Sequence, residues 1–190
     1  MNILMVEDMT EDVLNRVKSC LQSLEVSGGR GKRKEDTKSV KKSLAKLGQD
    51  LKYKVGTNRL DKDFAEENKF NNREWLFDLT WYLETNGHYE ITDLILAMEC
   101  EWGGQRVNAH DDRDEYGEVK YDFQKLIVSV SKIKLMIFHE RKEGDFANLI
   151  KDYFQPEIDR FNCAPLDSVF LCVAYNDLNK CKIECLRKRQ

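Results

Sequence analysis

"NNREWLFDLTWYLE" (residues 71–84) and "LILAMECEWGG" (residues 94–104) are the two stretches that decide the fold. In each of them apolar side chains recur at every second position, which is the period of a β-strand with one apolar face. Between them, "ETNGHYE" (84–90) contains an Asn-Gly step, a dipeptide typical of turns between antiparallel strands. The two stretches therefore predict a β-hairpin with strands over residues 74–83 and 92–102.

The rest of the chain supplies the other elements of an α/β protein. A first helix is expected to begin at Thr10 as its N-cap, and a second helix covers residues 36–52. A polar connector follows over residues 56–72, with a short helical turn at 63–69. The elements predicted after the hairpin are a helix over 119–130 with Val130 on its apolar face, a strand over 133–140, a helix over 145–161 interrupted at Pro156, and strands over 168–176 and 180–189.

These elements define the fold class and the domains that we expect. The fold class is α/β, a mixed β-sheet flanked by helices with an N-terminal helical segment. Residues 1–55 form the N-terminal helical, basic segment and residues 56–190 form the α/β core, within one compact domain.

The composition is that of an ordinary globular protein. Hydrophobic residues make up 41% and charged residues 34% of the chain. We see neither a signal peptide nor an apolar run of the length that spans a membrane, so we expect a cytoplasmic protein without a membrane partner. The six cysteines show no CxxC spacing and are expected to be buried free thiols.

Four carboxylates interrupt the apolar pattern of the hairpin: Glu74, Asp78, Glu99 and Glu101. A tight turn at the Asn-Gly step would place Glu74 opposite Glu99, whereas a loop wider by four residues would place Asp78 there. In both registers the parity is the same, so all four acids lie on one face of the sheet.

Directly opposed like charges destabilise a sheet, which leaves two explanations. Either this face is open to water, as the polar faces of many strands are, or a divalent cation lies between the acids. Ala97 leaves room beside Glu99, and no lysine alternates with the acids on these strands. Carboxylate oxygens on adjacent strands are the ligands that Mg²⁺ or Mn²⁺ prefers.

At this point the chain resembles a known family. A strand bearing an acid, a hairpin, a second strand bearing E-x-K or a variant of it, then a helix and further strands is similar to the restriction-endonuclease-like PD-(D/E)xK nucleases, over about residues 74–186. Asp78 takes the place of the first metal-binding aspartate, Glu99 that of the second acid, and Glu101 that of the usual lysine. The chain is thus an E-x-E variant, and Lys125 in "DFQKL" is the candidate for a lysine moved to the following helix.

The resemblance implies a metal-dependent nuclease acting on DNA, with RNA as an alternative. Asp78 and Glu99 would hold Mg²⁺ (or Mn²⁺), Glu101 would complete the coordination or orient water, and Lys125 would stabilise charge on the phosphate. Glu74 is expected to support these ligands or to replace Asp78. Lys125 lies about 200° from Phe123 around the helix, off its apolar face, so a solvated lysine is the other interpretation. Family members often act as dimers, so the resemblance also allows a homodimer.

The charge of the chain is unevenly distributed. Residues 29–54 contain ten Lys or Arg and three acids, although the whole chain has a net charge of −3. Such a segment is either the solvated face of a helix or a contact for nucleic-acid phosphates. The residues expected to bind nucleic acid are Lys32, Arg33, Lys34, Lys41 and Lys42.

An alternative from another class is a catalytically inactive relative that binds nucleic acid or a protein partner. The three histidines lack zinc-ligand spacing, and no P-loop, dinucleotide fingerprint or Gly-x-Ser-x-Gly motif is present.

Overall fold

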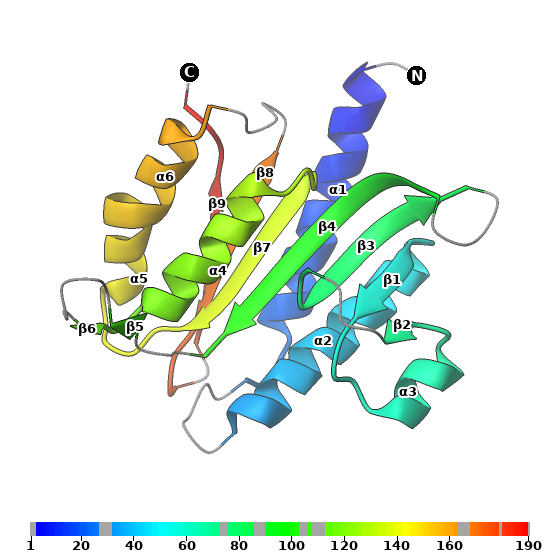
Figure 1. Ribbon diagram of the computed structural model, residues 1–190, viewed down its shortest axis with the longest axis horizontal. Coiled ribbons are helices and arrows are strands. Elements are labelled where there is room, and N and C mark those ends of the chain that lie inside the picture. Colours follow the sequence, from blue (N-terminus) through cyan, green and yellow to red (C-terminus); the bar gives the residue numbers. More distant parts are fainter. Residues whose placement is uncertain are drawn as a thin grey trace.

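A seven-stranded mixed sheet with the strand order β2-β1-β3-β4-β7-β8-β9 forms the centre of the protein (Figure 1). The computed structural model describes residues 3–26, 32–72, 76–85, 90–102, 106–107, 113–162, 168–178 and 180–189. The strands of the sheet are β1 (Lys54–Thr57), β2 (Asn71–Asn72), β3 (Leu79–Glu84), β4 (Ile91–Glu101), β7 (Ile133–His139), β8 (Val169–Tyr175) and β9 (Cys181–Leu186). The short strands β5 (Arg106–Val107) and β6 (Arg113–Asp114) pair separately.

The centre of the sheet is parallel, and antiparallel strands lie on either side of it, except that the edge strand β2 runs parallel to β1. β4, β7 and β8 run parallel, whereas β3 pairs antiparallel with β4, and β9 pairs antiparallel with β8. Every residue of β7 and β8 is buried, because helices cover both faces of these strands. The predicted fold class is therefore confirmed.

Helices cover the two faces of this sheet. Figure 1 shows α1 (Ile3–Gln22) and α2 (Arg33–Asp50) behind the sheet, and α4 (Gly117–Val128) in front of it. The front layer continues through α5 (Asp145–Leu149), the π-helical stretch Ile150–Phe154 and α6 (Gln155–Arg160), while α3 (Lys62–Glu67) lies beside β2. Pro156 does not end the helical run; the run widens to π-helix in the turn before this proline, which cannot donate a backbone hydrogen bond. No helix in the described ranges is both long enough and apolar enough to cross a bilayer.

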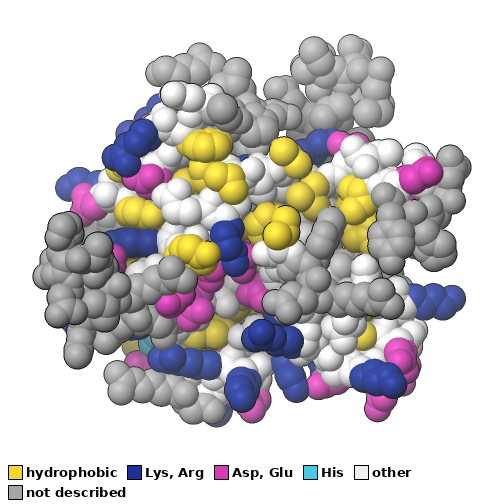
Figure 2. Space-filling view, in the orientation of Figure 1, with side chains coloured by type: hydrophobic (Ala, Val, Ile, Leu, Met, Phe, Trp, Pro, Cys, Tyr) yellow, Lys and Arg dark blue, Asp and Glu magenta, His cyan; other side chains and the backbone are white. Residues whose placement is uncertain are grey.

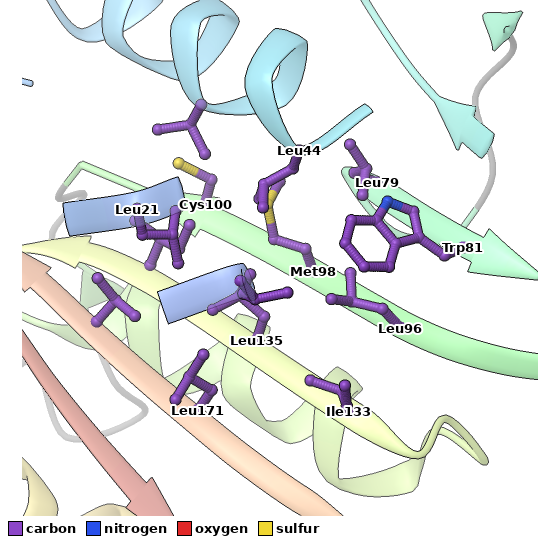
Figure 3. Close-up of a cluster of buried hydrophobic side chains, with 14 of the residues drawn as sticks. Leu21, Leu44, Leu79, Trp81, Leu96, Met98, Cys100, Ile133, Leu135 and Leu171 are labelled. Carbon is purple, nitrogen blue, oxygen red and sulfur yellow. The ribbon is translucent and has the colours of Figure 1, made fainter. Parts of the chain in front are cut away.

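The core behind the sheet joins α1 and α2 to the hairpin. Leu21 and Leu44 from the helices pack with Trp81, Met98 and Leu135 from the strands, as Figure 3 shows. The predicted N-terminal segment is thus part of this core. The five cysteines described are free thiols, but only Cys100 and Cys172 are buried as predicted; Cys20 and Cys181 are partly buried, Cys185 is exposed, and Cys163 lies outside the described residues.

Several boundaries differ from the predictions, and three of the differences have a clear physical reason. Thr10 is not an N-cap, because α1 begins at Ile3 and the residues between Ile3 and Thr10 include no Gly or Pro that would break the helix. Residues 54–57, partly assigned to a polar connector, form β1 with Val55 buried. Val130 is 75% exposed, because α4 ends at Val128 and the chain leaves the helix in an extended conformation at Ser129.

The register of the hairpin decides between the two arrangements of the acids. Leu79 pairs with Met98, so the register continues to Asp78 opposite Glu99, as the wider loop predicts. Glu74 and the Asn-Gly step lie outside the described residues. The alternation predicted over residues 74–83 holds only in part: residues 76–78 bend, and Phe77 packs on the α4 side while Leu79 packs on the α1–α2 side.

Candidate functional site

A pocket of about 660 Å³ lies where β3 begins and β4 ends, between α2 and α4. Its acidic residues are Asp78, Glu99, Glu101 and Asp122, and its basic residues are Arg33, Lys34, Lys38, Lys41, Arg59 and Lys125. In Figure 2 acidic side chains gather near the middle of the visible face, with Lys and Arg side chains below them, over α2. The pocket therefore has carboxylates at its sheet side and cations around them.

Asp78 continues the hairpin after the regular pairing has ended. Its Oδ2 accepts a hydrogen bond of 3.0 Å from the backbone N–H of Cys100, a β4 donor beyond the end of β3. The backbone carbonyl of Asp78 accepts a second bond, of 3.2 Å, from the Thr57 hydroxyl on β1. These bonds fix the carboxylate just before the first residue of β3, directly beside the last residues of β4.

Lys41 on α2 holds the other oxygen of Asp78. Its Nζ lies 2.8 Å from Asp78 Oδ1, although only 3% of the lysine side chain is exposed. The same ammonium donates to Asn58 Oδ1 at 2.6 Å and to the Asn58 carbonyl at 3.3 Å. A buried ammonium with three oxygen partners is well compensated, so Lys41 neutralises Asp78 from the α2 side of the sheet.

Glu99 lies on the opposite side of the sheet, under α4, so the expectation that all four acids share one face does not hold for Asp78 and Glu99. Lys125 Nζ is 2.6 Å from Glu99 Oε1 and 2.9 Å from Asp122 Oδ1. The Glu99 side chain is only 4% exposed, and its Oε1 makes this ion pair without the angles of a hydrogen bond. Burial raises the pKa of Glu99 to about 8, the charges of Asp78 and Asp122 add to the rise, and Lys125 opposes it.

The partners of Glu99 have shifted pKa values of their own. Burial raises the pKa of the Asp122 carboxyl, with Lys125 opposing the rise. Burial alone would lower the pKa of Lys125, but the two carboxylates outweigh it and raise that pKa above its ordinary value. The three side chains form a buried group with one cation and two acids, so at least one proton or a further cation is favoured there.

The pocket contains most of the predicted site residues. Asp78, Glu99, Glu101 and Lys125 all line it, and Lys125 reaches the acids although it lies off the apolar face of α4. The sequence analysis missed Asp122, whose spacing of three residues from Lys125 on one helix was the available signal. Asn58 and Arg59 were missed as well, since they belong to a loop that had been assigned to a connector.

The basic residues of α2 divide into separate groups. Arg33 and Lys34 line the pocket, whereas Lys32 is exposed outside the pocket lining. Lys41 was expected among the exposed phosphate contacts, but it is buried against Asp78 because α2 packs on the sheet at this point. Lys42 pairs with Asp61 at 2.7 Å on the side of α3.

No protein-family model matches the chain, and no curated protein or solved structure matches it significantly. The fold and the site define an α/β protein with a charged pocket at one end of a mixed sheet.

The donor set allows a limited test of whether a metal fits. Among the residues that the structure describes, no group of three or more His, Cys, Asp or Glu side chains is placed to hold a metal ion. Mg²⁺, however, is usually held by only one or two carboxylates together with water and substrate phosphates. Asp78 and Glu99 provide two carboxylates in one pocket, and each already has an ammonium partner, Lys41 at 2.8 Å and Lys125 at 2.6 Å, that a metal ion would have to displace. The residues are compatible with a Mg²⁺ site of this two-carboxylate type.

Proposed function

We propose that the protein is a metal-dependent nuclease of the PD-(D/E)xK type that hydrolyses phosphodiester bonds in DNA, with RNA as a further substrate class. One observation carries this proposal: Asp78, Glu99 and Lys125, from the start of β3, from β4 and from α4, line a single pocket. Its basic wall is formed by the first turns of α2. An acid-bearing strand, a hairpin, an E-x-E strand, a helix and further strands is also the order that the resemblance requires.

Asp78 and Glu99 would hold the metal, with Mg²⁺ or Mn²⁺ as the ion. When bound, such an ion polarises the scissile phosphate and lowers the pKa of a coordinated water. The chain contributes the placement of both carboxylates: the Cys100 N–H and the Thr57 hydroxyl fix Asp78, and the packing of α4 fixes Glu99. Burial raises the pKa of Glu99 to about 8 and Lys125 opposes that rise, so a metal ion would have to displace either a proton or the Lys125 ammonium from this carboxyl group.

Lys125 and Glu101 would act on the phosphate and on the attacking water. The Lys125 ammonium lies between Glu99 and Asp122 and is 36% exposed, so it can contact a phosphate oxygen without leaving the pocket. A cation at that position stabilises the charge that develops on the phosphoryl oxygens. Glu101 lines the same pocket, two residues along β4, and would orient the water.

A second candidate function is the inactive nucleic-acid-binding relative, and one observation favours it. Lys41 and Lys125 each form an ion pair with one of the two candidate ligands, Asp78 and Glu99. The protein therefore neutralises its own carboxylates, and a metal ion has to compete with two ammonium groups.

Cleavage of plasmid DNA with Mg²⁺ or Mn²⁺ separates the two candidates. We expect nicking by the wild type and a loss of at least 100-fold in Asp78→Asn and Glu99→Gln, since each removes a ligand charge. Glu66→Gln, which removes an exposed carboxylate of α3 outside the pocket lining, is the matched control. Binding of DNA without cleavage by the wild type would overturn the nuclease and support the inactive relative. Absence of both would overturn both candidates.

A further inference from the structure

Two cations at the pocket have no acidic partner among the residues that the structure describes. Lys38 pairs with Asp61, and Lys41 and Lys125 pair with acids of the site. Lys34 and Arg59 are exposed and line the pocket, and neither makes an ion pair or a side-chain hydrogen bond within the described part of the chain. Their charges are therefore available to a ligand, and the ligand must be an anion.

These two cations come from different elements. Lys34 is in the first turn of α2, whereas Arg59 is in the loop between β1 and α3. Both line the pocket that contains Asp78 and Glu99. One phosphate of a nucleic-acid backbone can contact these cations while a neighbouring phosphate lies near Asp78 and Glu99, whose charges Lys41 and Lys125 offset.

The loop holds Arg59 in a fixed and unusual conformation. Arg59 has a φ of +55°, in the left-handed region that residues with side chains rarely adopt. Its two neighbours are both anchored: Lys41 Nζ donates to the side chain and the carbonyl of Asn58, and Asn72 exchanges hydrogen bonds of 3.2 and 3.0 Å with the backbone of Leu60. Strained backbone that is held from both sides is characteristic of residues positioned for binding.

The anchor also connects this loop to the acidic part of the site. The Lys41 ammonium that holds Asn58 is the one that pairs with Asp78. The position of Arg59 relative to Asp78 is therefore set by one buried side chain, which reduces the ordering required when a ligand binds.

We propose that Lys34 and Arg59 form a phosphate clamp that holds the backbone of a nucleic acid across the mouth of the pocket, with Arg59 positioned by the bonds of Lys41 to Asn58. The guanidinium of Arg59 can bind one phosphate through two parallel N–H donors, and the Lys34 ammonium acts as a point charge on another. The clamp reads the backbone and is indifferent to base sequence. This inference rests on the proposed function in taking nucleic acid as the ligand.

Binding of a fluorescein-labelled 20-base-pair DNA duplex to the full chain, in EDTA, tests the clamp without cleavage. Fluorescence anisotropy at several salt concentrations gives the affinity and its salt dependence. We expect Lys34→Gln and Arg59→Gln each to weaken binding about 5- to 10-fold at 0.1 M salt and to reduce the slope of log K against log salt by about 1. Lys46→Gln removes the same charge from the exposed side of α2 outside the pocket lining and should leave both quantities nearly unchanged.

A second variant separates position from charge. Asn58→Ala keeps every charge but removes one of the anchors of the loop, so it should weaken binding while leaving the salt slope near that of the wild type. Equal effects of Arg59→Gln and Lys46→Gln would overturn the clamp, and so would a wild type that does not bind the duplex. A protein that binds through Arg59 but never cleaves supports the clamp and overturns only the nuclease. Cleavage that is unaffected by Arg59→Gln would support the nuclease and overturn the clamp.

Discussion

Replacement of Glu99 by Gln measures how much the carboxylate beneath α4 costs the folded protein. The side chain is 4% exposed, and Gln has nearly the same shape without the charge. Burial is the main reason that the pKa of Glu99 rises from an ordinary value of 4.5 to about 8. The folded protein therefore binds this proton more tightly than the unfolded chain does.

The sign and the size of the effect follow from these two values. The stability that Glu99 contributes is fully present below about pH 4.5, and it declines as the pH rises until about pH 8. One pKa unit corresponds to about 1.4 kcal/mol, so the contribution falls by about 2–3 kcal/mol between pH 5 and pH 7. Gln does not ionise. We therefore expect the free energy of unfolding of Glu99→Gln, relative to wild type, to rise by about 2–3 kcal/mol over that range and to level off above pH 8.

Urea unfolding followed by tryptophan fluorescence at pH 5, 6, 7 and 8 gives this difference. Other titrating groups are common to both proteins and largely cancel. Lys125→Met provides a second background, because loss of the ammonium raises the pKa of Glu99 further and should extend the rise beyond pH 8. A difference between variant and wild type that stays constant from pH 5 to 8 would refute the reasoning.

Three further substitutions probe the packing and the buried charges. Gly48→Ala should destabilise the protein by about 1–3 kcal/mol in urea unfolding despite the better helix propensity of Ala, because its Cβ would lie 2.5 Å from Trp81 Nε1. Lys41→Met leaves Asp78 without its ammonium partner and should lower the free energy of unfolding by about 2 kcal/mol. This is below the usual range for a buried ion pair because Asp78 is 23% exposed. The double variant with Asp78→Asn should recover most of that loss. Burial lowers the pKa of Lys134 on β7 to about 8. The free energy of unfolding of wild type should therefore rise by about 3 kcal/mol relative to that of Lys134→Met between pH 8 and 10.5. Equal pH profiles of the two proteins would contradict this.

The sequence predicts best those strands that are long enough to show a clear hydrophobic pattern. β4, β7 and β8 are each seven or more residues long and mostly apolar, and their positions were predicted to within about two residues. β1 has four residues, too few to show alternation, and it contains Gly56, a residue that is more typical of turns than of strand interiors. Its place in the sheet depends on pairing with β3, a contact between residues more than twenty positions apart.

The site is predictable in the same uneven way. Asp78 and Glu99 are identified by strand parity, because charges in an apolar alternation are costly unless they are paired. Lys41 could not be placed from its segment, since a lysine beside Val40 on a basic helix has the pattern of a solvated face. Its burial results from the packing of α2 over the start of β3, which no local pattern contains.

The arrangement of the charges implies that cation and phosphate would bind cooperatively. In the protein alone, the ammonium groups of Lys41 and Lys125 neutralise Asp78 and Glu99. The binding free energy of a divalent cation is therefore reduced by the free energy of the ion pairs that it replaces. A phosphate in the pocket offers Lys125 a different anion, which would release Glu99 to bind the metal. By linkage the coupling is reciprocal, and a bound metal would strengthen binding of the phosphate by the same factor. Under the proposed function, the lysines would hold the two carboxylates in place until a phosphate-bearing substrate binds, and paired acids would then be consistent with a metal site.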